Sequence, residues 1–151
     1  IGVYDVESMP EEVIDYAENL IEQIYAKSNY TVNSATLMKS GDYTVDITVY
    51  PIDIIQQLSA MDEIATVWSD LTAGFTDEEI ASMTDETHNA LDAQYATAIL
   101  SILEGLLPDL GYEDGQSVVM KLELNDNVYT AVDTDFANLD LMMIDYTGAY
   151  A

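Results

Sequence analysis

The amino-acid sequence predicts a single α+β domain over residues 1–151, with a four-stranded antiparallel sheet and helices packed on one face. Its length of 151 residues is typical of one domain, and hydrophobic residues make up 49% of it, enough for an ordinary core. Two pairs of strand patterns lie between helical patterns, in the order α-β-β-α-α-β-β-α. Because a short turn joins each strand pair, two hairpins are the economical way to build the sheet.

The first helix is expected to begin at a capping box formed by Ser8 and Glu11 and to end near Lys27. Two strands then flank the turn Ser40-Gly41-Asp42, over residues 30–39 and 43–50. In the second of these strands apolar and polar side chains alternate, which predicts one buried face and one wet face. The buried set is Tyr43, Val45, Ile47 and Val49, and the wet set is Thr44, Asp46, Thr48 and Tyr50.

The rest of the chain contains further helix and strand patterns. A helix over residues 54–71, with Asp53 as its cap, has an apolar stripe that includes Trp68, so we expect that ring to be buried against the sheet. A capping box from Thr76 to Glu79 opens a longer helical pattern to Pro108, with an interruption near Thr84. Strands over 118–124 and 128–132 and a helix over 135–144 complete the order.

Three joints resemble those of a known group of proteins. They are the strand 43–50 running into Pro51-Ile52-Asp53, the segment 74–80 (GFTDEEI) opening a long helix, and the strand that closes into a helix over 127–144. Together with the element order they resemble uncharacterised extracellular domains of Gram-positive surface lipoproteins, which have cystatin-like or nuclear-transport-factor-like α+β folds. The resemblance implies an extracytoplasmic protein attached to the cell surface, and it carries no catalytic residues.

The charge of the chain restricts its partners. The net charge is −26, from 29 acidic residues against three lysines. Nucleic acid is excluded as a partner because phosphates demand a basic face, and an anionic lipid surface is disfavoured for the same reason. Membrane attachment is therefore expected only through a lipid anchor upstream of Ile1. Self-repulsion of the carboxylates predicts that stability increases as pH falls towards about 5 and as salt is added.

No pattern indicates a catalytic, cofactor or metal site. His88 stands among acidic residues without a nucleophile in a recognisable context, and an ordinary surface histidine is the favoured interpretation. The segments 125–127 and 133–135 offer oxygen atoms for calcium, but neither follows the twelve-residue calcium loop. We therefore predict no enzyme, no cofactor and no metal.

The sequence leads to a non-catalytic extracytoplasmic binding or spacer module whose partner is an unknown protein or small ligand. The wet face of the sheet is the expected partner surface, and Lys121 on it should pair with a carboxylate of an adjacent strand. Two alternatives remain open: an acidic mimic that occupies a basic site on a partner, and a small-molecule pocket between sheet and helices that uses a buried aspartate. The expected partner-binding residues are Thr44, Asp46, Thr48, Tyr50 and Tyr129.

Overall fold

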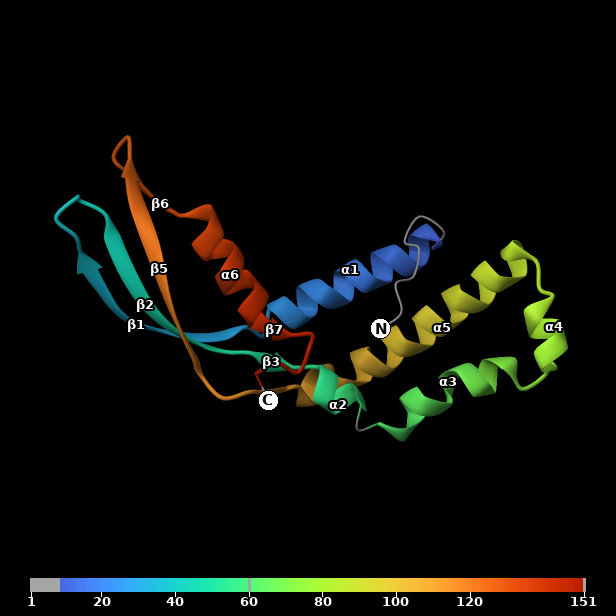
Figure 1. Ribbon diagram of the computed structural model, residues 1–151. Helices are drawn as coiled ribbons and strands as arrows, with labels where there is room; N and C mark the ends of the chain where they lie inside the picture. Colours follow the sequence, from blue (N-terminus) through green and yellow to red (C-terminus); the bar gives the residue numbers. More distant parts are fainter. Residues whose placement is uncertain (1–8, 60, 151) are drawn as a thin grey trace. The chain divides into compact units, whose positions relative to one another are not determined.

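The computed structural model describes residues 9–59 and 61–150, which fall into two compact units (Figure 1). Unit 1 comprises Ile1–Ile24 and Leu58–Asp109, and unit 2 comprises Tyr25–Gln57 and Leu110–Ala151. The α+β class is confirmed, with helices in both units and the strands in unit 2. That residues 1–151 form a single domain stays a prediction, because compactness does not measure whether two units unfold together.

Unit 1 is built from helices. The capping box downstream of Gly74 acts as predicted, between Thr76 and Glu79. The helical pattern is interrupted near Thr84 as expected, and the Thr84 side chain caps the next helix. The predicted capping box at Ser8 involves a position outside the described residues. The helices are α1 (Glu11–Tyr25, whose last residue belongs to unit 2), α3 (Asp62–Thr72), α4 (Asp77–Ala81), α5 (Asp85–Leu106) and the 3-10 helix η2 (Leu107–Asp109).

The predicted burial of Trp68 against the sheet is wrong. Its side chain is 36% exposed, and its ring packs edge-to-face on Tyr95 of α5, with ring centroids 5.8 Å apart. The predicted helix over 54–71 is two helices, α2 (Ile55–Ser59) and α3, so its apolar stripe is not continuous. Val67, one residue before the tryptophan, and Thr72 are the buried residues of α3.

Replacing Thr76 by alanine is expected to destabilise α4 by about 1 kcal/mol. The hydroxyl of Thr76 accepts a hydrogen bond from the Glu79 amide at 3.3 Å, and the Glu79 carboxylate accepts one from the Thr76 amide at 2.8 Å. The substitution removes the first bond and leaves a helix of five residues with weaker nucleation. The expected result is faster amide exchange in Asp77–Ala81 of Thr76→Ala, with exchange in α5 unchanged. Equal exchange rates in the parent protein and in Thr76→Ala would contradict the prediction.

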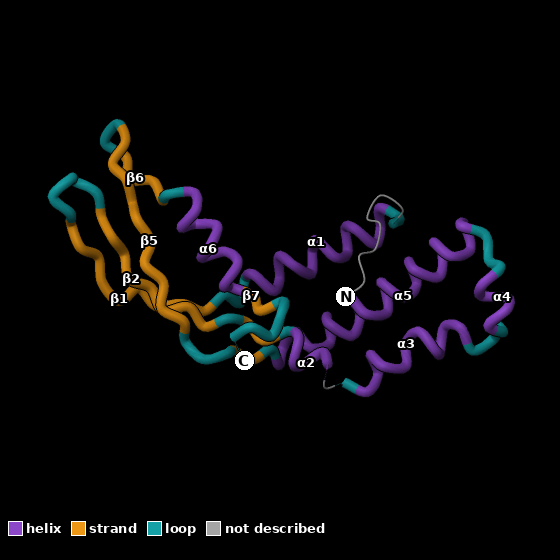
Figure 2. The backbone as a smooth tube through the Cα atoms, viewed as in Figure 1, coloured by secondary structure: helices purple, strands orange, loops and turns teal. Residues whose placement is uncertain are grey.

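Unit 2 contains the predicted four-stranded sheet. The strands β1 (Asn29–Leu37), β2 (Tyr43–Tyr50), β5 (Gln116–Asn125) and β6 (Val128–Ala131) lie in the order β1-β2-β5-β6, and every pair is antiparallel (Figures 1 and 2). Both hairpins are thus confirmed. Helix α6 (Asp133–Met143) packs on β2 and β5. The buried side chains of β2 are those predicted from its alternation, namely Val45, Ile47 and Val49.

A second, small sheet was not predicted. Its strands are β3 (Ile52–Asp53), β4 (Gly111–Tyr112) and β7 (Ile144–Asp145), in the order β4-β3-β7, with β3 and β7 parallel. Ile52 and Ile144 pair in register and are 0% and 1% exposed, so they are among the most deeply buried side chains of unit 2, with Val49 and Pro51. A strand of two residues has no periodicity to detect.

Candidate functional site

Four of the five predicted partner-binding residues share one face of the sheet. Thr44 lies opposite Lys121 of β5, and Thr48 lies opposite Ser117. Since neighbours in register project to the same side, the wet face continues from β2 onto β5 as predicted. Asp46 and Tyr50 follow the same alternation along β2.

The fifth residue, Tyr129, projects to the opposite face. It pairs with Leu124 of β5, two residues from Leu122, which faces Tyr43 of β2. The rings of Tyr129 and Tyr43 meet edge-to-face with centroids 5.1 Å apart, and the Tyr129 hydroxyl donates to the carbonyl of Gly41 at 3.2 Å. The structure therefore does not bring Tyr129 together with the other four residues.

The wet face is rich in hydroxyl groups. The register places further hydroxyl side chains of β1 beside those of β2: Thr31 pairs with Thr48, and Thr36 pairs with Thr44. The amide of Asn33 donates to the Thr48 hydroxyl at 2.9 Å. Each hydroxyl can both donate and accept hydrogen bonds, so this face can bind neutral polar groups and does not require a ligand of either charge.

Lys121 forms the ion pair that the sequence predicted on this face, with a different partner. Its ammonium group lies 3.0 Å from Glu123 on its own strand and 3.3 Å from Asp42, one residue before β2. The hydrogen bonds that Lys121 donates to the carboxylates of Glu123 and Asp42 raise the pKa of Lys121. The pKa of Asp42 is lowered by hydrogen bonds from the Ser40 hydroxyl, the Leu124 amide and Lys121. The wet-face assignment of Lys121 is correct, but its partners lie on its own strand and just before β2 rather than within an adjacent strand.

Asp145, at the end of β7, is a buried carboxylate with a structural role. It is 2% exposed, and its Oδ1 accepts hydrogen bonds from the backbone amides of Thr147, Gly148 and Ala149 at 2.8–3.1 Å. Its Oδ2 accepts one from the Tyr150 amide at 3.1 Å. Burial raises the pKa of Asp145, but these four donors outweigh it and hold the pKa below its ordinary value. Because its oxygens already accept these four hydrogen bonds, the Asp145 carboxylate stabilises the turn after β7. Its lowered pKa makes it a poor general base.

Glu113, just after β4, is the carboxyl group of the described residues with a raised pKa. Its Oε1 is enclosed and has no hydrogen-bond partner within the described part of the chain. Burial, followed by repulsion from Asp53, Asp145 and Asp114, raises the pKa of Glu113. Protonation would remove both penalties, so this group binds a proton more readily in the folded chain than in the unfolded one.

These shifts predict a stability maximum at mildly acidic pH. As pH falls from neutral, the folded state takes up a proton at Glu113 before the unfolded state does, so the free energy of unfolding rises. Below about pH 4 the trend reverses, because Asp42, Glu79 and Asp145 have lowered pKa values and lose their hydrogen-bonded charge.

Melting temperatures across pH 3–7, in 10 mM and 100 mM salt, test this expectation. Salt should raise the melting temperature at pH 7, since the screening length falls from about 30 Å to about 10 Å over this range. Glu113→Gln should flatten the rise between pH 7 and 5. A melting temperature that falls steadily from pH 7 would contradict the expected maximum.

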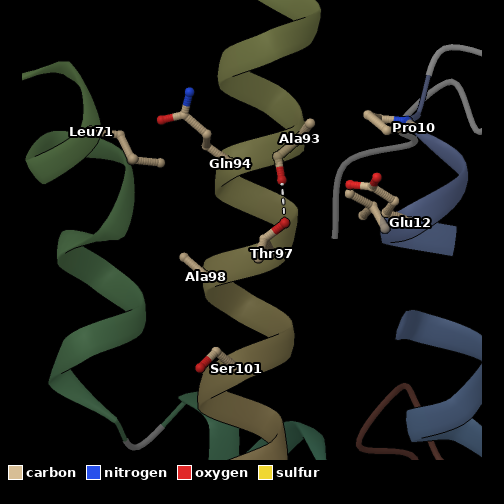
Figure 3. A pocket seen from close by; sticks show the side chains of 9 residues that line it. Pro10, Glu12, Leu71, Ala93, Gln94, Thr97, Ala98 and Ser101 are labelled. Carbon is tan, nitrogen blue, oxygen red and sulfur yellow. Dashed lines mark hydrogen bonds between the residues drawn. The ribbon is translucent and has the colours of Figure 1, made fainter. Parts of the chain in front are cut away.

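Unit 1 contains an open groove of about 510 Å³ along α5 (Figure 3). Small side chains of α5 form its floor, including Ala93, Thr97 and Ala98, and the Thr97 hydroxyl donates to the Ala93 carbonyl at 2.8 Å. Glu12 of α1 and Leu71 of α3 stand on its two sides. This groove lies among helices, whereas the predicted small-molecule pocket was placed between helices and the sheet, so it does not support that alternative.

The segments considered for calcium have structural roles. Asp126 and Asn127 adopt positive φ angles of 50° and 64° and form the tight turn between β5 and β6. Asp135 accepts a hydrogen bond from the Lys121 amide at 2.9 Å. Among residues 9–59 and 61–150 there is no group of three or more metal-ligating side chains placed to hold an ion. Within the same residues no helix is both long enough and apolar enough to cross a bilayer.

Comparisons with known proteins place this fold beside one solved structure. No protein-family model matches the chain, and no curated protein matches it. A crystal structure described as a "putative lipoprotein (ycdA)" from Bacillus subtilis subsp. subtilis str. 168 matches with a TM-score of 0.56 and 21% sequence identity. The match covers 89% of this chain and 38% of the Bacillus chain, so this chain spans well under half of that protein. At this identity the likeness concerns the fold alone.

Proposed function

We propose that this chain is a non-catalytic extracytoplasmic binding module of a bacterial surface lipoprotein. The observation that carries the proposal is the fold shared with the Bacillus putative lipoprotein over most of this chain. The sequence resemblance to extracellular lipoprotein domains points the same way, and its cystatin-like detail stays a prediction. The wet face of the sheet, with Thr44, Asp46, Thr48 and Tyr50, offers the hydroxyl-rich surface on which we expect a polar ligand or partner.

Digestion of intact cells tests the location. Cells of the source organism would be treated with proteinase K and probed with an antibody against residues 9–150. A broad protease is needed because the chain has only three lysines and no arginine for trypsin. Loss of the signal from intact cells, with a cytoplasmic control protein protected, is the expected result. Protection of the chain until the cells are lysed would contradict an extracytoplasmic location.

A second function, occupation of a basic site on a partner protein, is favoured by the distribution of charge. All three lysines fall in unit 2, so unit 1 carries acidic residues with no lysine or arginine. Such a surface attracts basic partners over long range. Binding of this type should weaken steeply as salt rises, whereas a hydroxyl-rich sheet face should bind with little salt dependence.

A further inference from the structure

Strand β1 is an edge strand with an open outer side. It stands at the end of the order β1-β2-β5-β6, and each of its nine residues is exposed (Figure 2). On its inner side it pairs with β2, and no strand in the described part of the chain pairs with its outer side. An open edge of this length presents a row of backbone donors and acceptors to another chain.

The side chains of β1 extend an apolar face to this edge. Val32 lies opposite Ile47, and Leu37 lies opposite Tyr43, so both project to the face on which β2 buries its apolar residues. Their neighbours Ile47 and Val49 on β2 are buried and Tyr43 is half-buried, but Tyr30 and Val32 are each 55% exposed and Leu37 is 59% exposed. The apolar face of the sheet is therefore uncovered along β1.

The charge distribution sets β1 apart from the rest of the chain. No acidic residue occurs between Glu22 and Asp42, although the chain has 29 of them. Two of the three lysines, Lys27 and Lys39, lie just beyond the two ends of β1. A strand that paired with β1 would thus desolvate no carboxylate of β1 itself.

The opposite edge of the sheet is built differently. Strand β6 has only four residues, against nine in β1. Short length is a common way to prevent pairing at a sheet edge. The contrast between the two edges indicates that β1 is left open for a partner while β6 is protected.

We propose that β1 binds an extended segment of another protein, which adds to the sheet as a fifth strand. The segment is uncharged along its length, has apolar residues at alternate positions to cover Val32 and Leu37, and carries an acidic residue near an end to face Lys27 or Lys39. This inference rests on the proposed binding function and names its surface and partner.

A second copy of this chain is a poor occupant of the same edge. Two chains that each carry a charge of −26 repel one another. Antiparallel pairing of two β1 strands about Asn33 would also place Lys27 opposite Lys39. A segment of another protein avoids both the repulsion between two acidic chains and the pairing of Lys27 with Lys39.

A synthetic peptide provides the probe. The peptide DYTVTITVY copies residues 42–50 with Asp46 replaced by threonine, so it begins with a carboxylate and alternates apolar and polar side chains. Its control has the same sequence with N-methyl groups at alternate residues, which remove strand donors without changing the side chains. Each peptide is titrated into the isotope-labelled full chain, and amide shifts and amide exchange are followed by nuclear magnetic resonance.

We expect the peptide to shift the amide signals of Asn29–Leu37 and to slow their exchange, and the N-methylated control to have no effect. Val32→Lys should weaken binding by about ten-fold or more, even though the added cation attracts the peptide carboxylate. Val128→Lys on β6 is the matched control: that valine is 59% exposed on the other edge of the same sheet. This variant should leave the affinity unchanged within about two-fold.

Four results would overturn the proposal: no binding of the peptide, shifts that map to β6 or to unit 1, equal weakening by both variants, or a chain dimer that Val32→Lys dissolves in sedimentation experiments. The titration uses purified chain, so it does not depend on cellular location. Peptide binding at β1 by a chain found inside the cell would refute the surface-lipoprotein function alone.

Discussion

Replacing Asp145 by alanine is expected to lower the free energy of unfolding of unit 2 by about 2–4 kcal/mol. The substitution removes the acceptor of four backbone amides, in Thr147, Gly148, Ala149 and Tyr150. Part-buried donors that lose their partner keep the cost of desolvation, which is why the effect should exceed that of one ordinary hydrogen bond.

Asp145→Asn keeps the shape of the side chain and removes its charge, so it separates the two contributions to stability. If its carbonyl takes the place of Oδ1, Asp145→Asn keeps three backbone donors and turns an amide group towards the Tyr150 N–H, so a loss of about 1–2 kcal/mol is expected. Asp126→Asn changes the net charge equally at an exposed turn and should stay within about 0.5 kcal/mol of the parent. Chemical denaturation, followed by signals from unit 2, measures the free energy of unfolding of all three variants. If Asp145→Ala lowered this free energy no more than Asp126→Asn does, the structural role of Asp145 would be refuted.

The second large effect is expected from Ile52→Ala, at about 3–5 kcal/mol. Ile52 is 0% exposed and lies in the middle strand of the small sheet, with Ile144 on one side and Tyr112 on the other. Truncation leaves a cavity that three short strands cannot easily close.

Two control variants test whether the effect of Ile52→Ala comes from the loss of buried volume. Ile52→Val removes one methylene and should cost about 0.5–1.5 kcal/mol. Leu141→Ala removes a side chain that is 70% exposed on α6, so its effect should be small. If Ile52→Ala unfolded at the same denaturant concentration as Leu141→Ala, the small sheet would not be part of the core of unit 2.

The four-stranded sheet could be predicted because its strands are long enough to show alternation. In β2 the two faces follow from the sequence, although Tyr43 of the predicted buried set is only half-buried, and the register places Lys121 on the wet face. The capping box at Thr76 could also be predicted, because it needs only neighbouring residues.

The remaining features depend on contacts between distant segments. Strands β3, β4 and β7 have two residues each, so their pairing arises from residues far apart in sequence. Trp68 fits a stripe that would be continuous only if α2 and α3 were one helix. The face of Tyr129 depends on the β5–β6 register, which the turn at Asp126 and Asn127 sets. Strand β1 was predicted, but its open edge was not; the long acid-free stretch between Glu22 and Asp42 is the sequence signal that sets this edge apart.

The central claim, a module of a surface lipoprotein, is tested most directly by lipid labelling of the natural full-length protein. Cells of the source organism would be grown with an alkyne-tagged fatty acid, and the protein recovered with an antibody against residues 9–150. The account predicts that the recovered protein carries the tag in the membrane fraction, and that a cut upstream of residue 9 releases this chain without the tag. An untagged protein recovered from the cytoplasmic fraction would contradict it.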